Sequence, residues 1–403
     1  MAVKMNIIGL GYIGLPTALT MAHAGYEVIG TDYNKELVKT LNEGKLTFEE
    51  KGLDELFNTA LNSGNVKFTD KYEKCNFYIV SVPTPYDKFS KKVDATYVIN
   101  AVKEVLNVCE EDAIIVIEST VSPGTIEKYV KPIINKKVNL VHAPERIIPG
   151  NMVYELKHNS RTIGADDKEI GEFVANIYRK TTDGEVIVTD IKSAEMTKVV
   201  ENTFRAVNIA FANELAKICR HDNMNVYEII KICNMHPRVN ILQPGPGVGG
   251  HCISVDPWFL VGDYPSLTNV IWESMKVNDS MPEFVLKRIS DIMDEKGLTD
   301  YKRVGLYGLT YKENVDDYRE SPALQLIEAQ IEHLAMPLKS YDPFIKKDIV
   351  PNQYHDLNKF LNDVDLVIIM VKHKEIIDNM NLLDGKIIFD TQNICSLPNT
   401  YKL

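Results

Sequence analysis

Short apolar runs alternate with amphipathic stretches over the first half of the chain. The runs occupy residues 4–8, 26–31, 77–82, 113–118 and 138–142. Continuous apolar runs of this length suit the strands of a parallel sheet that is buried on both faces. Strands that alternate with helices are typical of an α/β protein. The pattern therefore predicts one doubly wound domain over residues 1–190.

The spacing of the apolar residues changes at about residue 193. From there one long amphipathic helix is predicted to run to about residue 220. At 1.5 Å per residue this helix would be on the order of 40 Å long. A helix of that length between two α/β regions often serves a dimer, so we expect a homodimer. The apolar positions at helical spacing are Met196, Val199, Val200, Phe204, Val207, Phe211, Leu215 and Ile218.

A second α/β pattern begins after about residue 298. Strands are predicted at 304–309, 338–342, 366–371 and 386–390, with a helix over 322–334. The chain is thus expected to be an α/β protein with two Rossmann-like doubly wound domains, joined by a central helical segment with one long helix. The expected domain bounds are 1–190, 191–298 and 299–403, and a length of 403 residues accommodates them.

The first predicted turn carries the pattern G-x-G-x-x-G, formed by Gly9, Gly11 and Gly14. It follows a strand and opens a helix, which is the context in which the pattern binds a dinucleotide. The first glycine makes the tight turn, the second admits the pyrophosphate, and the third lets helix and strand pack. Asp32 ends the next strand, at the interval expected for binding a ribose hydroxyl. Tyrosine and asparagine follow it, without arginine, so NAD is favoured over NADP.

Composition narrows the classes of partner. The net charge of −11 makes nucleic acid an improbable partner, and an anionic substrate would need local cations. No apolar run reaches the roughly 18 residues of a membrane span, and the start leads straight into the first strand, so we expect neither a membrane segment nor a signal peptide. Six scattered cysteines without a C-x-x-C pair suggest no zinc site and no disulfide framework. We expect a cytoplasmic protein without a metal.

The stretch 244–256 combines glycines and prolines with Cys252 and, four residues later, Asp256. Glycine lets the backbone approach a ligand closely, so the loop can present a thiol to a substrate. The alternative is a turn with a buried, inert cysteine, because free cysteine is among the most buried residue types.

Three polar residues share one face of the predicted long helix, namely Lys198, Asn202 and Arg205. A lysine in apolar surroundings suits acid–base work. A solvated polar stripe is the alternative.

Further candidates lie at strand ends, where doubly wound folds bind their ligands. Each alone is more often structural, but together the cations among them could hold a diphosphate. The strand-end candidates are Thr84, Glu118, Thr120, Glu145, Arg146, Tyr311, Lys312 and Arg319, and the cationic set is Arg146, Lys198, Arg205, Arg238, Lys312 and Arg319.

With these motifs in order, the chain resembles the UDP-glucose/GDP-mannose dehydrogenase family over nearly its whole length. The shared motifs are GLGYIGLP, VPTP, EST-x-x-PGT, PER-x-x-PG, K-x-x-E-N-x-x-R, GGHC-x-x-x-D and Y-K-x-N-x-x-D-x-R-E-S-P. The resemblance implies an NAD-dependent nucleotide-sugar 6-dehydrogenase. Members that oxidise UDP-glucose usually carry Phe-Leu after Pro-Glu, whereas this chain has Arg146 and Ile147 there, like the branch that acts on N-acetylated sugars.

Residues 236–244 most resemble the members that oxidise UDP-N-acetyl-D-mannosamine. The implied reaction is a four-electron oxidation at C6, which gives UDP-N-acetyl-D-mannosaminuronate, a building block of surface polysaccharide. In the implied mechanism Cys252 forms a thiohemiacetal and then a thioester. Lys198 and Asn202 would stabilise oxyanions, Asp256 and Glu145 would serve hydrolysis, and Thr120 would help to organise the water.

The resemblance also implies two sets of binding residues, with Arg238 acting in the neighbouring subunit's site. The set around NAD is Gly9, Gly11, Tyr12, Ile13, Gly14, Asp32, Thr84, Thr120 and Arg319; the set around the UDP-sugar is Arg146, Ile147, Lys198, Asn202, Arg205, His236, Arg238, Gly249, Tyr311 and Lys312.

Other functions remain open at this stage. Within the same chemistry, UDP-N-acetylglucosamine or UDP-glucose is the alternative substrate. A β-hydroxyacid-type dehydrogenase shares a Rossmann domain and a helical lysine but would need neither Cys252 nor a second α/β domain. A nucleotide-sugar sensing protein would leave the retention of Lys198, Asn202, Cys252 and Asp256 without a reason.

Overall fold

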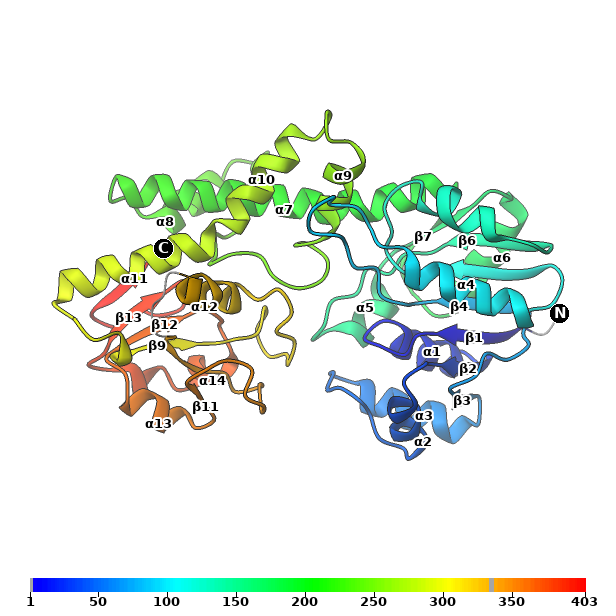
Figure 1. Ribbon diagram of the computed structural model, residues 1–403, viewed down its shortest axis with the longest axis horizontal. Helices are drawn as coiled ribbons and strands as arrows, with labels where there is room; N and C mark the ends of the chain where they lie inside the picture. The colour runs from blue at the N-terminus through cyan, green and yellow to red at the C-terminus, as the bar shows by residue number, and fades with distance from the viewer. Residues whose placement is uncertain (1–2, 333–336) are drawn as a thin grey trace. The chain divides into compact units, whose positions relative to one another are not determined.

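The computed structural model describes residues 3–332 and 337–403 and divides into two compact units, Met1–Glu201 and Asn202–Leu403 (Figure 1). Each unit is built on a mainly parallel sheet, so the predicted α/β class is confirmed. Among the described residues, no helix is long and apolar enough to cross a membrane. The division into three domains remains a prediction.

The sheet of the first unit has the strand order β3-β2-β1-β4-β5-β6-β7-β8. Every neighbouring pair is parallel except β6 and β7. The order reverses between β1 and β4, and doubly wound sheets bind their ligands at the carboxyl edge beside such a reversal. The strands are β1 (Lys4–Ile8), β2 (Glu27–Thr31), β3 (Val66–Thr69), β4 (Phe77–Val80), β5 (Ala113–Ile117), β6 (Val138–His142), β7 (Arg161–Ala165) and β8 (Val186–Thr189).

Helices cover both faces of this sheet, because successive strand residues point to opposite sides. In β1, for example, Met5 and Ile7 join the core under α1, α3 and α6, while Ile8 joins the core under α4 and η1. The helices of this unit are α1 (Gly14–His23), α2 (Lys35–Asn42), α3 (Leu53–Ser63), α4 (Thr96–Val108), the π-helix η1 (Ile126–Val130), the 3-10 helix η2 (Lys131–Ile133), α5 (Met152–His158) and α6 (Lys168–Tyr178).

The predicted long helix is present as α7 (Ile191–His221), which has 31 residues. It begins two residues earlier and ends one residue later than the period indicated. Its apolar residues do not all face a core: Val199 is fully buried, whereas Phe204, Phe211 and Ile218 are at least half exposed. The helix therefore has a buried side and an apolar side that is at least half exposed at these three residues.

The second unit combines helices with a parallel sheet of order β11-β10-β9-β12-β13-β14. Helix α11 packs beside α12 on one face of this sheet, and α13 and α14 cover the other (Figure 1). The strands are β9 (Val304–Tyr307), β10 (Lys339–Tyr341), β11 (Gln353–Tyr354), β12 (Leu366–Ile369), β13 (Ile387–Asp390) and β14 (Thr400–Lys402).

The helix predicted over 322–334 is found as α12 (Pro322–Glu332), and its last two predicted residues lie outside the described ones. The remaining helices of the second unit are α8 (Val226–Cys233), α9 (Asp256–Asp263), α10 (Asn269–Asp279), α11 (Met281–Lys296), α13 (Leu357–Asn362) and α14 (Lys374–Asp378), with the 3-10 helices η3 (Tyr301–Arg303) and η4 (Met380–Leu383).

A buried carboxylate near the start of α7 holds the loop that follows β5. Glu195 accepts hydrogen bonds from the backbone N–H of Gly124 at 2.5 Å and of Ile126 at 2.9 Å. Its side chain is almost completely buried. Burial raises the pKa of Glu195 to about 7, against the opposing effect of these two N–H donors.

We predict that Glu195 makes the stability of the first unit depend on pH. Because the folded carboxyl binds its proton more tightly than the unfolded one, its contribution is complete below about pH 4.5 and is lost as the pH rises through about 7. The difference between the melting temperature of the wild type and that of Glu195→Gln should therefore decrease by roughly 5 °C from pH 5 to pH 8.

Differential scanning calorimetry is the suitable measurement, since both tryptophans, Trp258 and Trp272, lie in the second unit and fluorescence would not report on the first. Glu169→Gln, at an exposed position on α6, is the control and should show no such trend. A difference between wild type and Glu195→Gln that stays constant from pH 5 to pH 8 would contradict the prediction.

Candidate active site

Two of the three fingerprint glycines are required by sterics within the first unit. Gly9 adopts φ +91°, and a Cβ there would lie 2.5 Å from the carbonyl oxygen of Ser81. A Cβ on Gly14 would lie 1.8 Å from the carbonyl oxygen of Gly9. Only glycine lets the turn and the first residue of α1 approach this closely.

Gly11 differs, because a Cβ at this position would meet no protein atom within 4 Å. It stands in the turn before α1, whose first backbone N–H groups favour an anion. Open space at the second glycine and close packing at the other two is what a bound pyrophosphate requires. The residues present therefore fit a dinucleotide cofactor.

Asp32 stands directly after β2 and ties this turn to the next loop. Its Oδ2 accepts a hydrogen bond from the backbone N–H of Leu10, and its Oδ1 accepts one from Asn34, both at 2.8 Å. Each carboxylate oxygen has a further lone pair, so Asp32 can also accept from ribose hydroxyls. The position matches the one predicted from the interval after the glycines.

The structure brings several predicted cofactor residues together. Thr84, after β4, donates a hydrogen bond from its hydroxyl to the carbonyl oxygen of Thr120 at 2.7 Å. Tyr12 and Ile13 pack against the buried cluster of Ile147, Met152 and Leu156. Residues that lie more than a hundred positions apart in the sequence thus meet at the carboxyl edge of one sheet.

A buried ion network lies beside this edge. Arg161 pairs with Glu118 at 2.9 Å and with Glu145, and all three side chains are at most 5% exposed. Glu118 also accepts hydrogen bonds from the hydroxyls of Thr17 and Ser81. Because Arg161 is always charged, it keeps a counter-ion beside both carboxylates. Glu145, the predicted hydrolytic base, is therefore held in one place by a cation.

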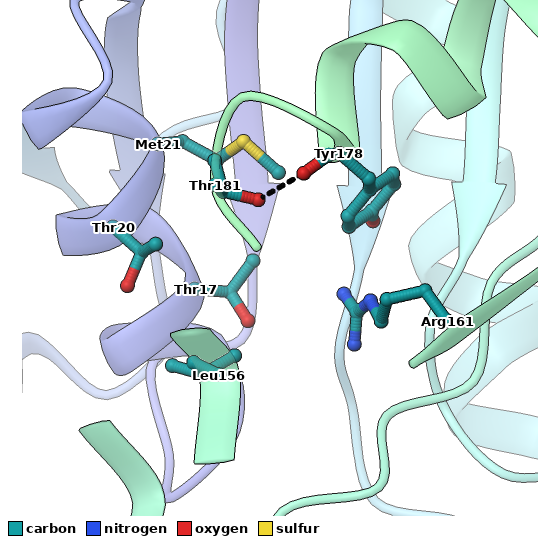
Figure 2. Close-up of a pocket in the computed structure, with 7 residues that line it drawn as sticks. All are labelled: Thr17, Thr20, Met21, Leu156, Arg161, Tyr178 and Thr181. Carbon is teal, nitrogen blue, oxygen red and sulfur yellow. Dashed lines mark hydrogen bonds between the residues drawn. The ribbon is translucent and has the colours of Figure 1, made fainter. Parts of the chain in front are cut away.

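Figure 2 shows the guanidinium of Arg161 next to the ring of Tyr178, at the side of a pocket against helix α1. The guanidinium carbon lies 4.4 Å from the ring centroid, a cation–π arrangement. Burial raises the pKa of Tyr178 well above its ordinary range, so its hydroxyl stays neutral. The other residues that line the pocket are Thr17, Thr20, Met21, Leu156 and Thr181.

Arg146, predicted to contact the UDP-sugar, makes its side-chain bonds within the protein. Its guanidinium pairs with Glu201 at 3.0 and 2.5 Å and donates to Ser160 and Thr162. In this arrangement Arg146 braces the 145–148 loop against α7. A direct part in holding a diphosphate stays a prediction for it.

Helix α7 carries the polar residues predicted to work at C6. Lys198 and Asn202 are buried and stand one helical turn apart, whereas Arg205 is exposed. The solvated-stripe reading is therefore wrong for the first two residues.

Within the second unit, Asn202 donates a hydrogen bond from its amide to Asp256 Oδ2 at 2.6 Å. Asp256 is buried in the first turn of α9. The two predicted catalytic residues are thus in direct contact, and the bond fixes the orientation of the Asn202 amide.

Cys252 is exposed, so the alternative of a buried, inert cysteine is wrong. Its carbonyl oxygen accepts hydrogen bonds from the backbone N–H of Val255 at 3.1 Å and of Asp256 at 2.8 Å, which makes the turn into α9. Across the described residues, none of the six cysteines forms a disulfide.

The predicted C-terminal binding residues gather against the same loop. A Cβ on Gly249 would lie 2.8 Å from the Cβ of Tyr311, and Gly250 donates its N–H to the carbonyl oxygen of Arg319 at 3.0 Å. Arg319 itself pairs with Asp317 through two hydrogen bonds, at 2.8 and 2.6 Å. Lys312 follows Tyr311 on the loop after β9.

His236 and Arg238 stand together in an exposed turn after α8, where the backbone N–H of Arg238 donates to His236 Nδ1 at 3.3 Å. Their part in substrate binding stays a prediction. Throughout residues 3–332 and 337–403, no group of three or more His, Cys, Asp or Glu side chains is placed to hold a metal ion.

Arg161 and the buried pair of Asp342 and His373, whose side chains are 3.2 Å apart, were not predicted from the sequence. A signal existed for Asp342, because it stands at the end of the predicted strand 338–342, and Asp32 stands directly after the predicted strand 26–31. No local signal marks Arg161, whose partners lie 16 and 43 residues away.

Comparison with known families assigns most of the chain to one family. The NAD binding domain of the UDP-glucose/GDP-mannose dehydrogenase family matches residues 3–182, the central domain of that family matches 192–280, and its UDP binding domain matches 305–397.

Individual relatives agree with this match. The UDP-N-acetyl-D-mannosamine dehydrogenase of Methanococcus vannielii is 43% identical over 97% of this chain and 93% of its own. The UDP-N-acetyl-mannosamine dehydrogenase structure from Staphylococcus aureus is 39% identical, with a TM-score of 0.88 over 99% of this chain and 97% of that one. The UDP-D-ManNAc dehydrogenase from Pyrococcus horikoshii gives 33% identity and a TM-score of 0.90 over 99% and 98%.

We predict that removing the cation from the buried network destabilises the first unit strongly. Arg161→Met leaves Glu118 and Glu145 buried without their counter-ion, at a cost of about 3–5 kcal/mol. Arg179→Met, which removes an exposed pair with Glu172, should cost at most about 1 kcal/mol. Calorimetric melting of both variants at pH 7 measures the difference.

Adding Glu145→Gln to Arg161→Met should recover part of the loss, because one buried charge is then removed. If Arg161→Met had the same melting temperature as Arg179→Met, the prediction that this ion network stabilises the first unit would be contradicted.

Proposed function

Since the chain belongs to the UDP-glucose/GDP-mannose dehydrogenase family, we propose that it oxidises the C6 alcohol of UDP-N-acetyl-D-mannosamine to UDP-N-acetyl-D-mannosaminuronate. As a member of this family it is an NAD-dependent nucleotide-sugar dehydrogenase, and NAD is its cofactor. The observation that carries the proposal is an exposed thiol, Cys252, in a glycine-shaped turn that leads directly into the buried pair of Asn202 and Asp256. The choice of sugar rests on the substrate named for relatives up to 43% identical.

The proposed reaction proceeds in two oxidations, and NAD+ accepts the hydride from C6 in each when it is bound. Lys198 takes the proton of the C6 alcohol as the aldehyde forms. The Cys252 thiolate then adds to the aldehyde carbon, and the proton held by Lys198 passes to the carbonyl oxygen to give a thiohemiacetal. Loss of a second hydride from C6, with return of the hydroxyl proton to Lys198, leaves a thioester. The thiol route thus holds the reactive aldehyde between the two oxidations.

Hydrolysis completes the proposed sequence. Glu145 takes a proton from water as the water attacks the thioester carbon, and the Cys252 thiolate leaves. Arg161, which pairs with Glu145, holds this carboxylate in its buried place. One sugar, one water and two NAD+ thereby give the carboxylate, two NADH and three protons.

Oxyanions arise at C6 in both the addition and the hydrolysis. We assign their stabilisation to Lys198 and Asn202, because a buried cation and an oriented amide act strongly where water is excluded. The bond of 2.6 Å from Asn202 to Asp256 supports this assignment, since it fixes the amide before the substrate binds. In the proposal Asp256 positions Asn202 and the residues around the hydrolytic water.

Steady-state kinetics with a panel of three UDP-sugars test the proposed specificity. We expect UDP-N-acetyl-D-mannosamine to be oxidised with a kcat/KM at least about ten-fold above those of UDP-N-acetylglucosamine and UDP-glucose, a difference of about 1.4 kcal/mol. Two NADH should form per sugar, with the acid identified by mass spectrometry. Equal turnover of the gluco epimer removes the choice of sugar, and one NADH per sugar would favour a β-hydroxyacid-type dehydrogenase.

Replacing the nucleophile separates binding from chemistry. Cys252→Ser should bind the UDP-sugar within about three-fold of the wild type but lose about 10³-fold or more in acid formation, because a hydroxyl is a far weaker nucleophile than a thiolate. Cys233→Ser, at a partly exposed cysteine of α8, is the control and should keep full turnover. Acid formation by Cys252→Ser at near the normal rate is incompatible with the thioester route.

The apolar side of α7 supports the proposal of a homodimer. Phe204, Phe211 and Ile218 are 68%, 50% and 51% exposed and follow one another at a spacing of seven residues, which places them along one line of the helix. An exposed apolar line on a long helix is the surface that a second copy of the same helix covers.

We predict that Phe211→Asp converts this dimer to a monomer at micromolar concentration, because it buries a charge at the centre of that line. Ile377→Asp, at a similarly exposed apolar position on α14, is the control and should leave the dimer intact. Sedimentation velocity measures both. A wild-type chain that sediments as a monomer at micromolar concentration contradicts the dimer.

We place the reaction in the cytoplasm, where thiols stay reduced, and assign the product to the synthesis of surface polysaccharide. The absence of a disulfide among the cysteines of the described residues supports this location. An extracellular site would expose the nucleophile to oxidation.

A further inference from the structure

In each unit an aspartate at the carboxyl edge of the sheet accepts a backbone N–H from the neighbouring loop, and we call this contact the carboxylate lock. In the first unit, the backbone N–H of Leu10 donates to Asp32 Oδ2 at 2.8 Å. In the second unit, the backbone N–H of Leu309 donates to Asp342 Oδ2 at 2.6 Å. Both aspartates directly follow the second strand of their sheet, and both leucines follow a glycine with φ above +90°. The second sheet therefore repeats the loop architecture of the first.

The carboxylate lock of the second unit differs from that of the first because a histidine, His373, contacts its aspartate. His373 is the fourth residue after β12, the place that Thr84 occupies after β4. Its side chain is fully buried, and its Nε2 lies 3.2 Å from Asp342 Oδ2. The second oxygen accepts the backbone N–H two residues further on in both units, from Asn34 to Asp32 and from Phe344 to Asp342, each at 2.8 Å. The contact of Asp342 with His373 is therefore an addition to the arrangement that the two units share.

The hydrogen bonds determine which nitrogen of His373 carries the proton. The backbone N–H of Asn314 donates to His373 Nδ1 at 3.0 Å, so Nδ1 is the acceptor. Nε2 therefore carries the hydrogen, which it shares between Asp342 Oδ2 and the hydroxyl of Thr310, each 3.2 Å away. Burial opposes ionisation of Asp342, but the hydrogen bond from His373 and the backbone N–H donors hold its pKa below the ordinary value. The imidazole of His373 thus connects Asp342 with the far end of the loop.

The loop between these two anchors is 309–314. Inside it, the hydroxyl of Thr310 donates to the carbonyl oxygen of Lys312 at 2.9 Å. At its end, Asn314 adopts φ +57°, and its side-chain oxygen accepts the backbone N–H of Lys374 at 2.9 Å. His373 and the residue after it therefore hold the loop at the point where it turns back.

This loop supports the turn that presents the thiol. Tyr311 lies against the glycines, because a Cβ on Gly250 would be 2.9 Å from its Cε2 atom. Gly250 adopts φ +84° and precedes Cys252 by two residues. A shift of Tyr311 would therefore be transmitted to the backbone beside the thiol.

We propose that His373 is a positioning residue, which holds the 309–314 loop so that Tyr311 and Lys312 meet the UDP part of the substrate. The inference rests on the proposed function and adds to it a residue that does not touch the substrate. It acts through hydrogen bonds to the loop, at the backbone N–H of Asn314 and the hydroxyl of Thr310, and through one to Asp342.

The test compares three variants of the full-length protein. His373→Phe keeps a ring of similar size and removes all of these hydrogen bonds. His373→Asn keeps an acceptor near the position of Nδ1, toward Asn314, and loses the contact with Asp342. His355→Asn, at an exposed histidine of the same unit that pairs with Asp348, is the matched control.

Calorimetric titration with UDP measures the binding, and steady-state kinetics separate the two ligands. We expect His373→Phe to weaken UDP binding about ten-fold or more and to raise the KM for the UDP-sugar, with the KM for NAD within two-fold of the wild type. His373→Asn should lie between His373→Phe and the wild type. His355→Asn should bind UDP like the wild type.

Two results overturn the proposal. One is a folded His373→Phe variant that binds UDP within two-fold of the wild type; if that variant does not fold, wild-type affinity in His373→Asn decides in the same way. The other is an equal rise in the KM for NAD, which would indicate general damage. Failure to oxidise the mannosamine sugar in the substrate panel removes only the proposed substrate, because UDP affinity is measured without turnover.

Discussion

The carboxylate that follows the second strand of each sheet is the constraint on which the rest of the structure depends. Asp32 and Asp342 each bind the backbone N–H of the residue after a glycine turn. A parallel sheet brings the carboxyl ends of its strands to one edge, so one carboxylate can bind the neighbouring loop. Without this bond the buried N–H group would lack a partner, at a cost of about 1–3 kcal/mol. The lock thus fixes the turn on which the ligand-binding loops are built.

The two units use that edge differently. In the first, the loops after β4 and β5 meet through Thr84 and Thr120, beside a buried cation that serves two carboxylates. In the second, His373 contacts Asp342 and holds the 309–314 loop. Tyr311 of this loop packs on the two glycines before Cys252, at positions 249 and 250. The first unit therefore leaves open space at Gly11, where a ligand can approach. In the second unit the side chain of His373 holds the 309–314 loop in place.

The α/β class, the long helix and the glycine fingerprint could be predicted from the sequence, because each depends on a local period or spacing. The contact of Asn202 with Asp256 could not, since they lie 54 residues apart and join only after α7 and α9 pack. Arg161 was missed for the same reason. The exposure of Phe204 also contradicts the simple expectation that every apolar residue of an amphipathic helix faces its own core.

The most direct test of the account is to trap the substrate on Cys252. In a Glu145→Gln variant, hydrolysis should slow while both oxidations continue. After mixing with NAD+ and the UDP-sugar and quenching in acid, mass spectrometry of the digested protein should find the acyl-sugar adduct on the peptide that contains Cys252. An adduct on another residue, or two NADH formed in the first turnover with no adduct at any time, would contradict the central claim that this thiol carries the sugar.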